Sequence, residues 1–304
     1  MVLLLRSLRV SAWRHYATVS SSGAKKVSET NKLEHTLSKF WDKVGLAEKD
    51  DGYHIQLDGK SIKTPLGFQM SVPKSKHSLA YLLANEWKHL PNLQIRPYLV
   101  PLTSLVSRCI DLEESHRSKD PELLAKVGDL DSIKEMLLRY LDTDTLLVFS
   151  PAADCEGKLR KAQEETYRPI IKSMEEYFQK HAQAGEPINL TYMDSDIHGL
   201  VGNKQPEATV KAVRSWLDSL DVWSIVCLER ATLTAKSFLT GVAILRLNNK
   251  DDSFDVTVDE LARAATLETI FQTEQWGEVE DTHDVDKVDV QRNLNSASLI
   301  VYNH

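Results

Sequence analysis

Residues 257–284 read TVDELARAATLETIFQTEQWGEVEDTHD, a stretch with the spacing of an amphipathic helix. Thr257 and Glu260 stand three residues apart, as in a capping box, so a helix is predicted to begin at this point. Gly277 is a residue type that commonly follows the last turn of a helix. Apolar side chains recur at helical spacing between these two ends, at Leu261, Ala264, Ala265, Ile270 and Phe271. One long helix over residues 257–276 is therefore predicted.

A row of polar and aromatic residues runs along this predicted helix. Counting by fours from Ala264 reaches Glu268 and then Gln272, and Trp276 continues the row. One interpretation is a core helix whose two polar side chains are satisfied internally or lie at the margin of the apolar face. The other is a recognition surface made of a carboxylate, an amide and an indole. Because a carboxylate buried on that face would be costly unless paired, Glu268 is a candidate functional residue.

Length and composition indicate an ordinary globular protein. The chain has 304 residues, of which 42% are hydrophobic and 27% charged, enough for a large core and two domains. Its formal net charge of -7 argues against a broad nucleic-acid surface. The three cysteines lack C-x-x-C spacing, so neither a disulfide framework nor a zinc site is indicated, and Cys109 and Cys227 are expected to be buried. Beyond the N-terminus, no stretch stays apolar for the ~20 residues of a membrane span, so no membrane insertion is predicted.

Residues 1–28 have the composition of a mitochondrial transit peptide. Arg6, Arg9 and Arg14 alternate with leucines and other apolar residues, and no acidic residue precedes Glu29. The arginines interrupt the apolar run that a secretory signal would need. The mature protein is therefore predicted to lie in the mitochondrial matrix.

Residues 29–100 are predicted to form a β-rich N-terminal domain. Apolar residues alternate from Tyr53 to Leu57, and Asp58-Gly59 is a favoured pair for a tight hairpin. Residues 68–72 are expected to add a third strand. The following helix places Leu79, Leu82, Leu83 and Trp87 on one side, which would cover the sheet. Trp87, next to Glu86, is interpreted as a core indole, the alternative being a direct partner contact.

Residues 101–284 are predicted to form a mainly α-helical bundle domain, and residues 285–304 a separate C-terminal tail. Expected helices include one capped by Asp131, one over residues 158–181 that Pro169 ends or kinks, one opened by Pro206, and a central, nearly apolar one over residues 231–247. Residues 145–149 are expected to form a short buried strand paired with residues 188–192. The predicted fold class is α+β: a small antiparallel sheet with a covering helix, followed by helices.

Motifs of known chemistry are absent from the sequence. It contains no G-x-G-x-x-G, G-x-x-x-x-G-K-[ST], G-x-S-x-G or H-E-x-x-H. The acids and imidazole of Asp281, His283, Asp284 and Asp286 are of metal-binding types, but acidic residues after a helix are more often solvated. No metal or cofactor is therefore predicted, and a binding function is favoured.

Several motifs in order along the chain resemble one family, the mitochondrial ATP synthase assembly chaperones called F(1)-ATPase assembly factor 2. The resemblance runs from about Phe40 to Asp284, and the sequence departs from it at Asp281 and Thr282. The motifs are Phe40-Trp41, LDGKSIKTPLG at 57–67, Val72-Pro73, Asn85-Glu86-Trp87, Pro101-Leu102-Thr103 with Asp111, DTDTL at 142–146, and QTEQWGEVE at 272–280.

This resemblance implies a non-enzymatic matrix chaperone that binds the unassembled alpha subunit of the ATP synthase F(1) head and shields its subunit interface. It also implies a small N-terminal sheet and a helical C-terminal domain, in agreement with the patterns above. The critical glutamate of the family corresponds to Glu268, and its motif tryptophan to Trp87. The predicted partner-binding residues are Glu268, Gln272, Trp276 and Glu278, and the predicted structural residues are Asp58, Gly59, Glu86 and Trp87.

A second hypothesis is a matrix hydrolase or metal-binding enzyme. It would use Glu268 as a general base or the acids between Asp281 and Asp286 as metal ligands. Such an enzyme requires a closed polar pocket around Glu268, whereas a chaperone requires an exposed surface beside it.

Overall fold

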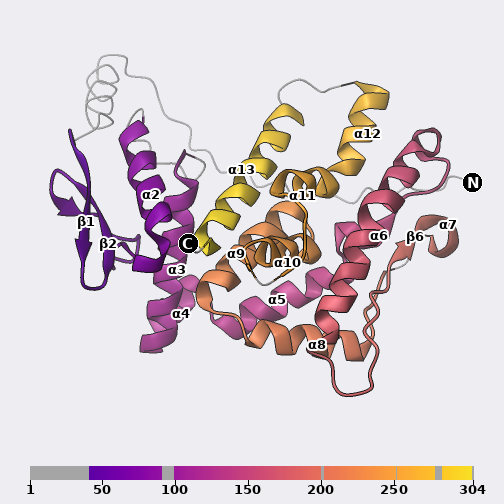
Figure 1. Ribbon diagram of the computed structural model, residues 1–304, viewed down its shortest axis with the longest axis horizontal. Coiled ribbons are helices and arrows are strands. Elements are labelled where there is room, and N and C mark those ends of the chain that lie inside the picture. Colours follow the sequence, from indigo (N-terminus) through magenta and orange to yellow (C-terminus); the bar gives the residue numbers. More distant parts are fainter. Residues whose placement is uncertain (1–40, 91–98, 200–201, 251, 278–282, 303–304) are drawn as a thin grey trace, which may run out of the picture. The chain divides into compact units, whose positions relative to one another are not determined.

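The computed structural model describes residues 41–90, 99–199, 202–250, 252–277 and 283–302 (Figure 1). The predicted transit peptide lies outside the described residues. The first part is a small antiparallel sheet in which the central strand β2 pairs with each of the other three. Its strands are β1 (Val44–Lys49), β2 (Gly52–Leu57), β3 (Lys60–Ser61) and β4 (Ser71–Val72).

The hairpin between β2 and β3 is closed by the predicted pair of turn residues. Leu57 pairs with Lys60, and the two residues between them both have positive φ, 47° at Asp58 and 81° at Gly59. Positive φ at both central positions defines the type I′ turn that matches the twist of antiparallel strands. The Asp58 carboxylate also accepts the backbone N–H of Lys43 at 2.8 Å, which ties the turn to the start of β1.

Helix α2 (His77–His89) packs on β1 and β2, as expected from its apolar face. Its buried side chains are Leu79, Ala80, Leu83 and Trp87. The prediction for Leu82 was wrong: this side chain is 37% exposed. Ala80 is buried instead, so the buried face of the helix runs through Leu79, Ala80 and Leu83.

Glu86 and Trp87 join α2 to the next helix, α3 (Pro101–Ser118). The Glu86 carboxylate accepts the backbone N–H groups of Leu102 at 2.7 Å and Thr103 at 2.9 Å, two donors that have no partner within the helix. The Trp87 indole N–H donates to the Thr103 hydroxyl at 3.0 Å, and its ring meets the ring of Trp41 edge-on at 5.5 Å. Trp87 is therefore a core residue of this junction.

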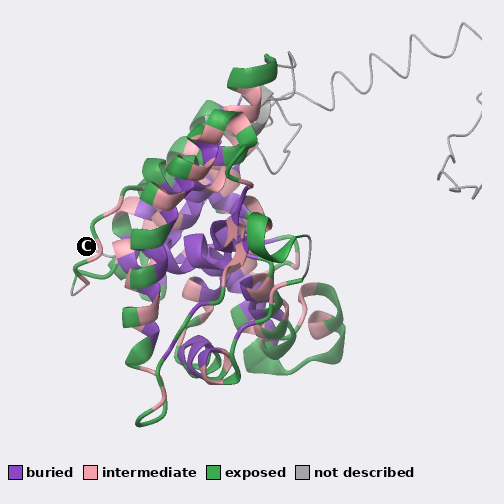
Figure 2. Cartoon of the chain, turned by 90° about the vertical axis from the view of Figure 1, so that its right-hand side faces the viewer, coloured by how far each residue is buried: buried purple, intermediate pink, exposed green. Residues whose placement is uncertain are grey.

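The remaining chain is mostly helical, and buried residues gather where its helices face one another (Figure 2). Helix α9 packs against α3, α5, α10 and α13. The helices are α4 (Pro121–Val127), α5 (Leu130–Asp142), α6 (Lys158–Gln179), α7 (Ser195–His198), α8 (Glu207–Asp218), α9 (Val222–Ala235), α10 (Phe238–Leu247), α11 (Val258–Ala265), α12 (Leu267–Trp276) and α13 (His283–Val301). Short 3-10 turns are η1 (Lys74–Lys76), η3 (Thr145–Leu147) and η4 (Asp154–Gly157), and two further strands are β5 (Val148–Phe149) and β6 (Met193–Asp194).

The helix predicted over residues 231–247 is two helices. Lys236 is left-handed at φ 51°, and the Ser237 side chain accepts the N–H of Thr240 to start α10. The two helices then pack closely at Gly241, where a Cβ atom would lie 2.7 Å from Leu228 Cδ1. As the sequence indicated, small residues in this stretch allow helices to pack closely. The close contact is between α9 and α10, which are joined by a sharp turn, and not along one continuous helix.

The predicted pairing of residues 145–149 with residues 188–192 was also wrong. The strand is short, and β5 pairs in parallel with β6, Val148 opposite Met193. The backbone N–H groups just before β6 donate to side chains. The amide oxygen of Gln179 accepts from Ile188, and the carboxylate of Glu175 accepts from Leu190. Because these donors are already satisfied, that segment does not enter a sheet.

Two other boundaries differ from the prediction, and one agrees closely. Asp129 caps α5 in place of Asp131. Helix α6 covers nearly the predicted range, and Pro169 does not end it. Residues 285–304 were set apart as a tail, whereas α13 packs on α9, α3 and α11. The buried side chains of α13 are Leu294, Ala297, Ile300 and Val301, which make it part of the core.

Candidate functional site

The candidate site begins at a break between α11 and α12. The capping box is confirmed: the Thr257 hydroxyl accepts the N–H of Glu260 at 3.2 Å, and the Glu260 carboxylate accepts the N–H of Thr257 at 2.7 Å. The prediction of a single long helix was wrong, because the backbone departs from helical geometry at Thr266, with φ -111° and ψ 12°. There the Thr266 hydroxyl donates back to the carbonyl of Ala262 at 2.9 Å, a local bond that competes with helix continuation.

The break separates the buried and exposed parts of the predicted row. Ala264 is buried and its carbonyl accepts the Tyr167 hydroxyl at 3.1 Å, whereas Glu268 is exposed. The expectation of a carboxylate on a buried face was therefore wrong. The spacing of Glu268 and Gln272 does bring them together, because the Gln272 Nε2 donates to Glu268 Oε1 at 2.9 Å. Trp276 closes the same helix, is 72% exposed, and is followed by the predicted stop at Gly277, φ 85°.

Helix α12 is held to the rest of the protein by few side chains. Only Leu267 is buried, and Ile270 and Phe271 are half-buried, while α12 rests on α6 and η4. A ten-residue helix that buries one side chain gains little stability from the core. Its apolar surface remains partly accessible beside the Glu268 carboxylate, the arrangement expected of a binding surface.

The turn η4, which lies against α12, was missed by the sequence analysis. Cys155 and Glu156 both adopt left-handed φ, 49° and 58°, and Gly157 follows at 79°. Each non-glycine residue in this region costs about 1 kcal/mol, so the turn is a strained segment held by its surroundings. Gly157 was the one local signal in the sequence, and it does not reveal the two residues before it.

The other predicted site residues lie elsewhere. Glu278 lies outside the described residues, and so do the side chains of the acidic group between Asp281 and Asp286. The structural residues Asp58, Gly59, Glu86 and Trp87 belong to the sheet and α2, and Figure 1 shows these elements on the opposite side of the described structure from α12. Asp58 and Gly59 close the β2–β3 hairpin, and Glu86 and Trp87 join α2 to α3, so none of the four belongs to α12.

The chemistry of α12 is that of a surface contact. The exposed Glu268 carboxylate offers acceptors next to a donor amide. Within the described ranges, no three His, Cys, Asp or Glu side chains are placed to hold a metal ion. In the same ranges, no helix has the length and apolar character required to span a bilayer.

An exposed, weakly packed helix that ends in an aromatic residue presents the kind of side chain that is enriched in protein–protein contacts, as in a protein-binding protein. Comparison with known proteins gives the family. The family described as ATP12 chaperone protein matches residues 38–175. The mitochondrial protein ATP12 of Saccharomyces cerevisiae is 49% identical over 285 residues, which cover 90% of this chain and 87% of that relative. The mitochondrial protein atp12 of Schizosaccharomyces pombe is 34% identical over 264 residues, 86% of this chain and 81% of the relative.

This chain therefore belongs to the ATP12 chaperone family, and the resemblance found in its motifs is confirmed. Like the two relatives, it is a mitochondrial protein. The fold is shared with the crystal structure of Atp12 from Paracoccus denitrificans, with a TM-score of 0.64 at 21% identity, over 88% of this chain and 98% of that one. The predicted α+β class, a small antiparallel sheet followed mostly by helices, is confirmed.

Proposed function

We propose that this protein assists assembly of the F(1) catalytic head of mitochondrial ATP synthase in the matrix, where it binds the unassembled alpha subunit. Its task is to cover apolar surface that the alpha subunit later buries against the beta subunit, which prevents self-association before assembly. Membership of the ATP12 chaperone family supports the chaperone role, and the motif resemblance supports the choice of client.

The observation that carries the proposed binding site is the exposure of α12. Trp276, 72% exposed, is the kind of side chain that dominates binding energy once it is covered by a partner. Glu268 and Gln272 present an acceptor and a donor beside it, and these fix the orientation of a partner rather than its affinity. Glu278 is included in the surface from its place in the same sequence motif. The proposal gives the protein no catalytic step.

Substitutions at Glu268 test this function. Glu268→Gln keeps the shape of the side chain and removes its charge, so assembled ATPase should fall in cells that lack the native chaperone, and Glu268→Lys should abolish it. Both variants should melt close to wild type, because exposed substitutions usually change the free energy of unfolding by within about 0.5 kcal/mol.

The matched control is Glu165→Lys, which makes the same charge reversal at an exposed position of α6. It should leave assembly unchanged. Full rescue of assembly by Glu268→Lys would refute a role for this carboxylate in recognition. A loss of assembly that only follows a lower melting temperature would instead assign Glu268 a structural role.

A further inference from the structure

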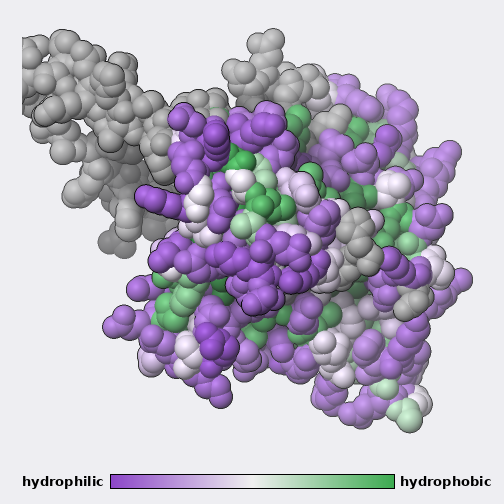
Figure 3. Space-filling view, turned by 60° about the vertical axis from the view of Figure 1, so that its left-hand side comes forward, coloured by the Kyte–Doolittle hydropathy of each residue, from purple (hydrophilic) through white to green (hydrophobic). Residues whose placement is uncertain are grey.

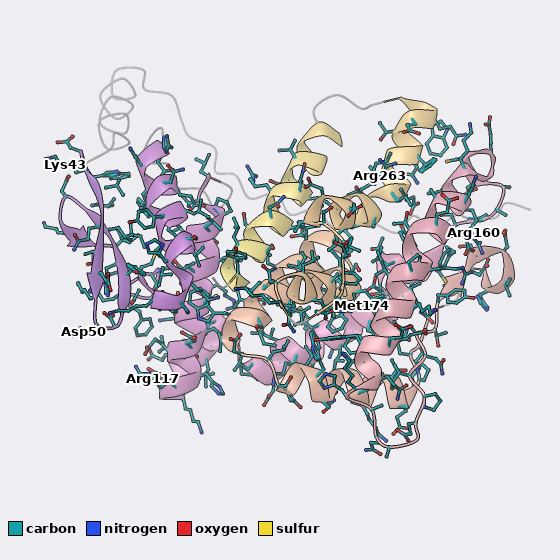
Figure 4. The ribbon with its side chains drawn as sticks, in the orientation of Figure 1. Lys43, Asp50, Arg117, Arg160, Met174 and Arg263 are labelled. Carbon is teal, nitrogen blue, oxygen red and sulfur yellow. The ribbon has the colours of Figure 1, made fainter. Side chains whose placement is uncertain are left out.

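A pocket separate from α12 lies where the sheet meets the helical bundle. Its volume is about 450 Å³, within the range that holds a small ligand or a large side chain. The walls come from the β1–β2 turn, the segment around β4, the C-terminal half of α3 and the start of α9. Figure 4 labels Asp50, which is in this turn, and Arg117, near the end of α3, on the same side of the structure. The side chains that matter for its chemistry are Asp51, Phe68, Glu113, Glu114, Arg117 and Trp223.

Three carboxylates from two elements give the pocket an excess of negative charge. Asp51 lies 2.9 Å from His54 Nε2, a hydrogen bond that lowers the pKa of the carboxyl and keeps it ionised. Glu114 pairs with Arg117, so one of the three is already neutralised by a guanidinium. Burial raises the pKa of Glu113, and the nearby acids Asp221 and Glu114 raise it further. A cation entering the pocket would relieve that repulsion.

The aromatic walls suit a cation that is also planar. Glu113 Oε1 accepts the indole N–H of Trp223 at 2.9 Å, which fixes both groups and leaves Glu113 Oε2 without a protein partner among the described residues. Trp223 is only 6% exposed and its ring already holds the Lys76 ammonium 5.3 Å from the centroid, so this indole positions Glu113 rather than stacking on a ligand. Phe68 supplies a second ring. A guanidinium stacks on aromatic rings and pairs with carboxylates through its fork of N–H donors.

A metal ion is a poorer fit for the same walls. Within the described parts of the chain, no three acidic, histidine or cysteine side chains converge closely enough to hold one. The face turned forward in Figure 3, which brings the sheet side into view, is mostly hydrophilic with small separate hydrophobic groups. A partner on this side is therefore held by polar contacts rather than by a broad apolar interface.

We propose that this pocket binds an arginine side chain presented by a polypeptide partner, with Glu113 Oε2 and Asp51 accepting from the guanidinium and the half-buried Phe68 stacking beside it. The proposal goes beyond the function proposed for α12 and does not depend on it, since it involves none of the same residues. Arg117, paired with Glu114 at the same pocket, occupies one of the three carboxylates, so its removal frees that acceptor for the incoming arginine.

The test uses the full chain labelled with ¹⁵N and a pair of small probes, N-acetyl-arginine methylamide and its citrulline counterpart. The two have nearly the same shape, but only the first is charged. The readout is the indole N–H signal of Trp223, assigned by its loss in Trp223→Phe. The arginine probe should move this signal in a saturable way, and the citrulline probe should not.

Variants then locate the binding groups. Glu113→Gln can still accept from Trp223, so the fold is kept while the charge is lost, and binding should weaken about tenfold or more, as for one charge-assisted hydrogen bond. Arg117→Ala should tighten binding several-fold, a gain that a folding defect would not produce. Glu165→Gln, the same change on α6, should have no effect.

Equal shifts with both probes, no shift with the arginine probe, or undiminished binding by Glu113→Gln would each overturn the proposal. Because no ATP synthase subunit is present in the experiment, its result is independent of the function proposed for α12.

Discussion

Replacement of Trp87 by arginine should unfold the junction between the sheet and the helical bundle. Trp87 is 7% exposed, its indole N–H donates to Thr103 at 3.0 Å, and its ring packs against Trp41. The same junction holds the first backbone donors of α3 on Glu86. A change here therefore affects how α2, α3 and the sheet are joined, and not one contact alone.

The size of the effect follows from these contacts. Emptying the site of a large aromatic ring costs about 3–5 kcal/mol. Loss of the indole hydrogen bond adds about 1 kcal/mol, and a guanidinium without a partner in the same place adds a further penalty, reduced if it reaches solvent. A total of at least about 4 kcal/mol is a large share of the roughly 5–15 kcal/mol that stabilises a folded domain.

Urea unfolding and the yield of soluble protein measure this loss, with Trp276→Arg as the matched control. The control makes the same substitution at a 72% exposed site, so its free energy of unfolding should stay within about 0.5 kcal/mol of wild type. A Trp87→Arg protein as stable as wild type that failed to bind its client would refute the core assignment.

Two further outcomes follow from buried groups of the bundle. Burial raises the pKa of Asp144 from 3.8 to about 6. The folded state thus holds this proton to higher pH than the unfolded state, and the contribution of Asp144 to stability decreases as pH rises from about 4 to about 6, by roughly 3 kcal/mol at most. Asp144→Asn should flatten that part of the pH profile in urea unfolding, and identical slopes would contradict the burial argument. Gly241→Ala should destabilise the protein by about 1–3 kcal/mol, because the new Cβ would lie 2.7 Å from Leu228 Cδ1 and 2.9 Å from Thr232 Oγ1; an unchanged melting temperature would show that α9 and α10 move apart freely.

Local signals in the sequence predicted the structure correctly where the geometry of a short segment depends only on its own residues. The Thr257–Glu260 capping box and the Asp58-Gly59 turn need only neighbouring residues, and both are present as predicted. The sheet and its covering helix also follow from alternation and helical spacing, because burial of one face determines both patterns.

Contacts between distant segments account for what the sequence did not reveal. The break at Thr266 combines the local bond to the carbonyl of Ala262 with a bond to the carbonyl of Ala264 from Tyr167, which lies 97 residues away. The place of α13 in the core depends on its packing against α9, which its own pattern of residues did not indicate. For the candidate site, spacing predicted that Glu268 and Gln272 meet, but their exposure depends on the break.

The most direct test of the account is a crosslink from α12 to its client. A photoreactive phenylalanine replaces Trp276 in the chain expressed in mitochondria, and the control replaces Tyr81, an aromatic residue of α2 that is 57% exposed. Irradiation before assembly is complete should join position 276 to the alpha subunit of ATP synthase and give little product from position 81. Absence of an alpha-subunit adduct from position 276, or equal yields from both positions, would contradict the proposal that α12 is the surface that binds the client.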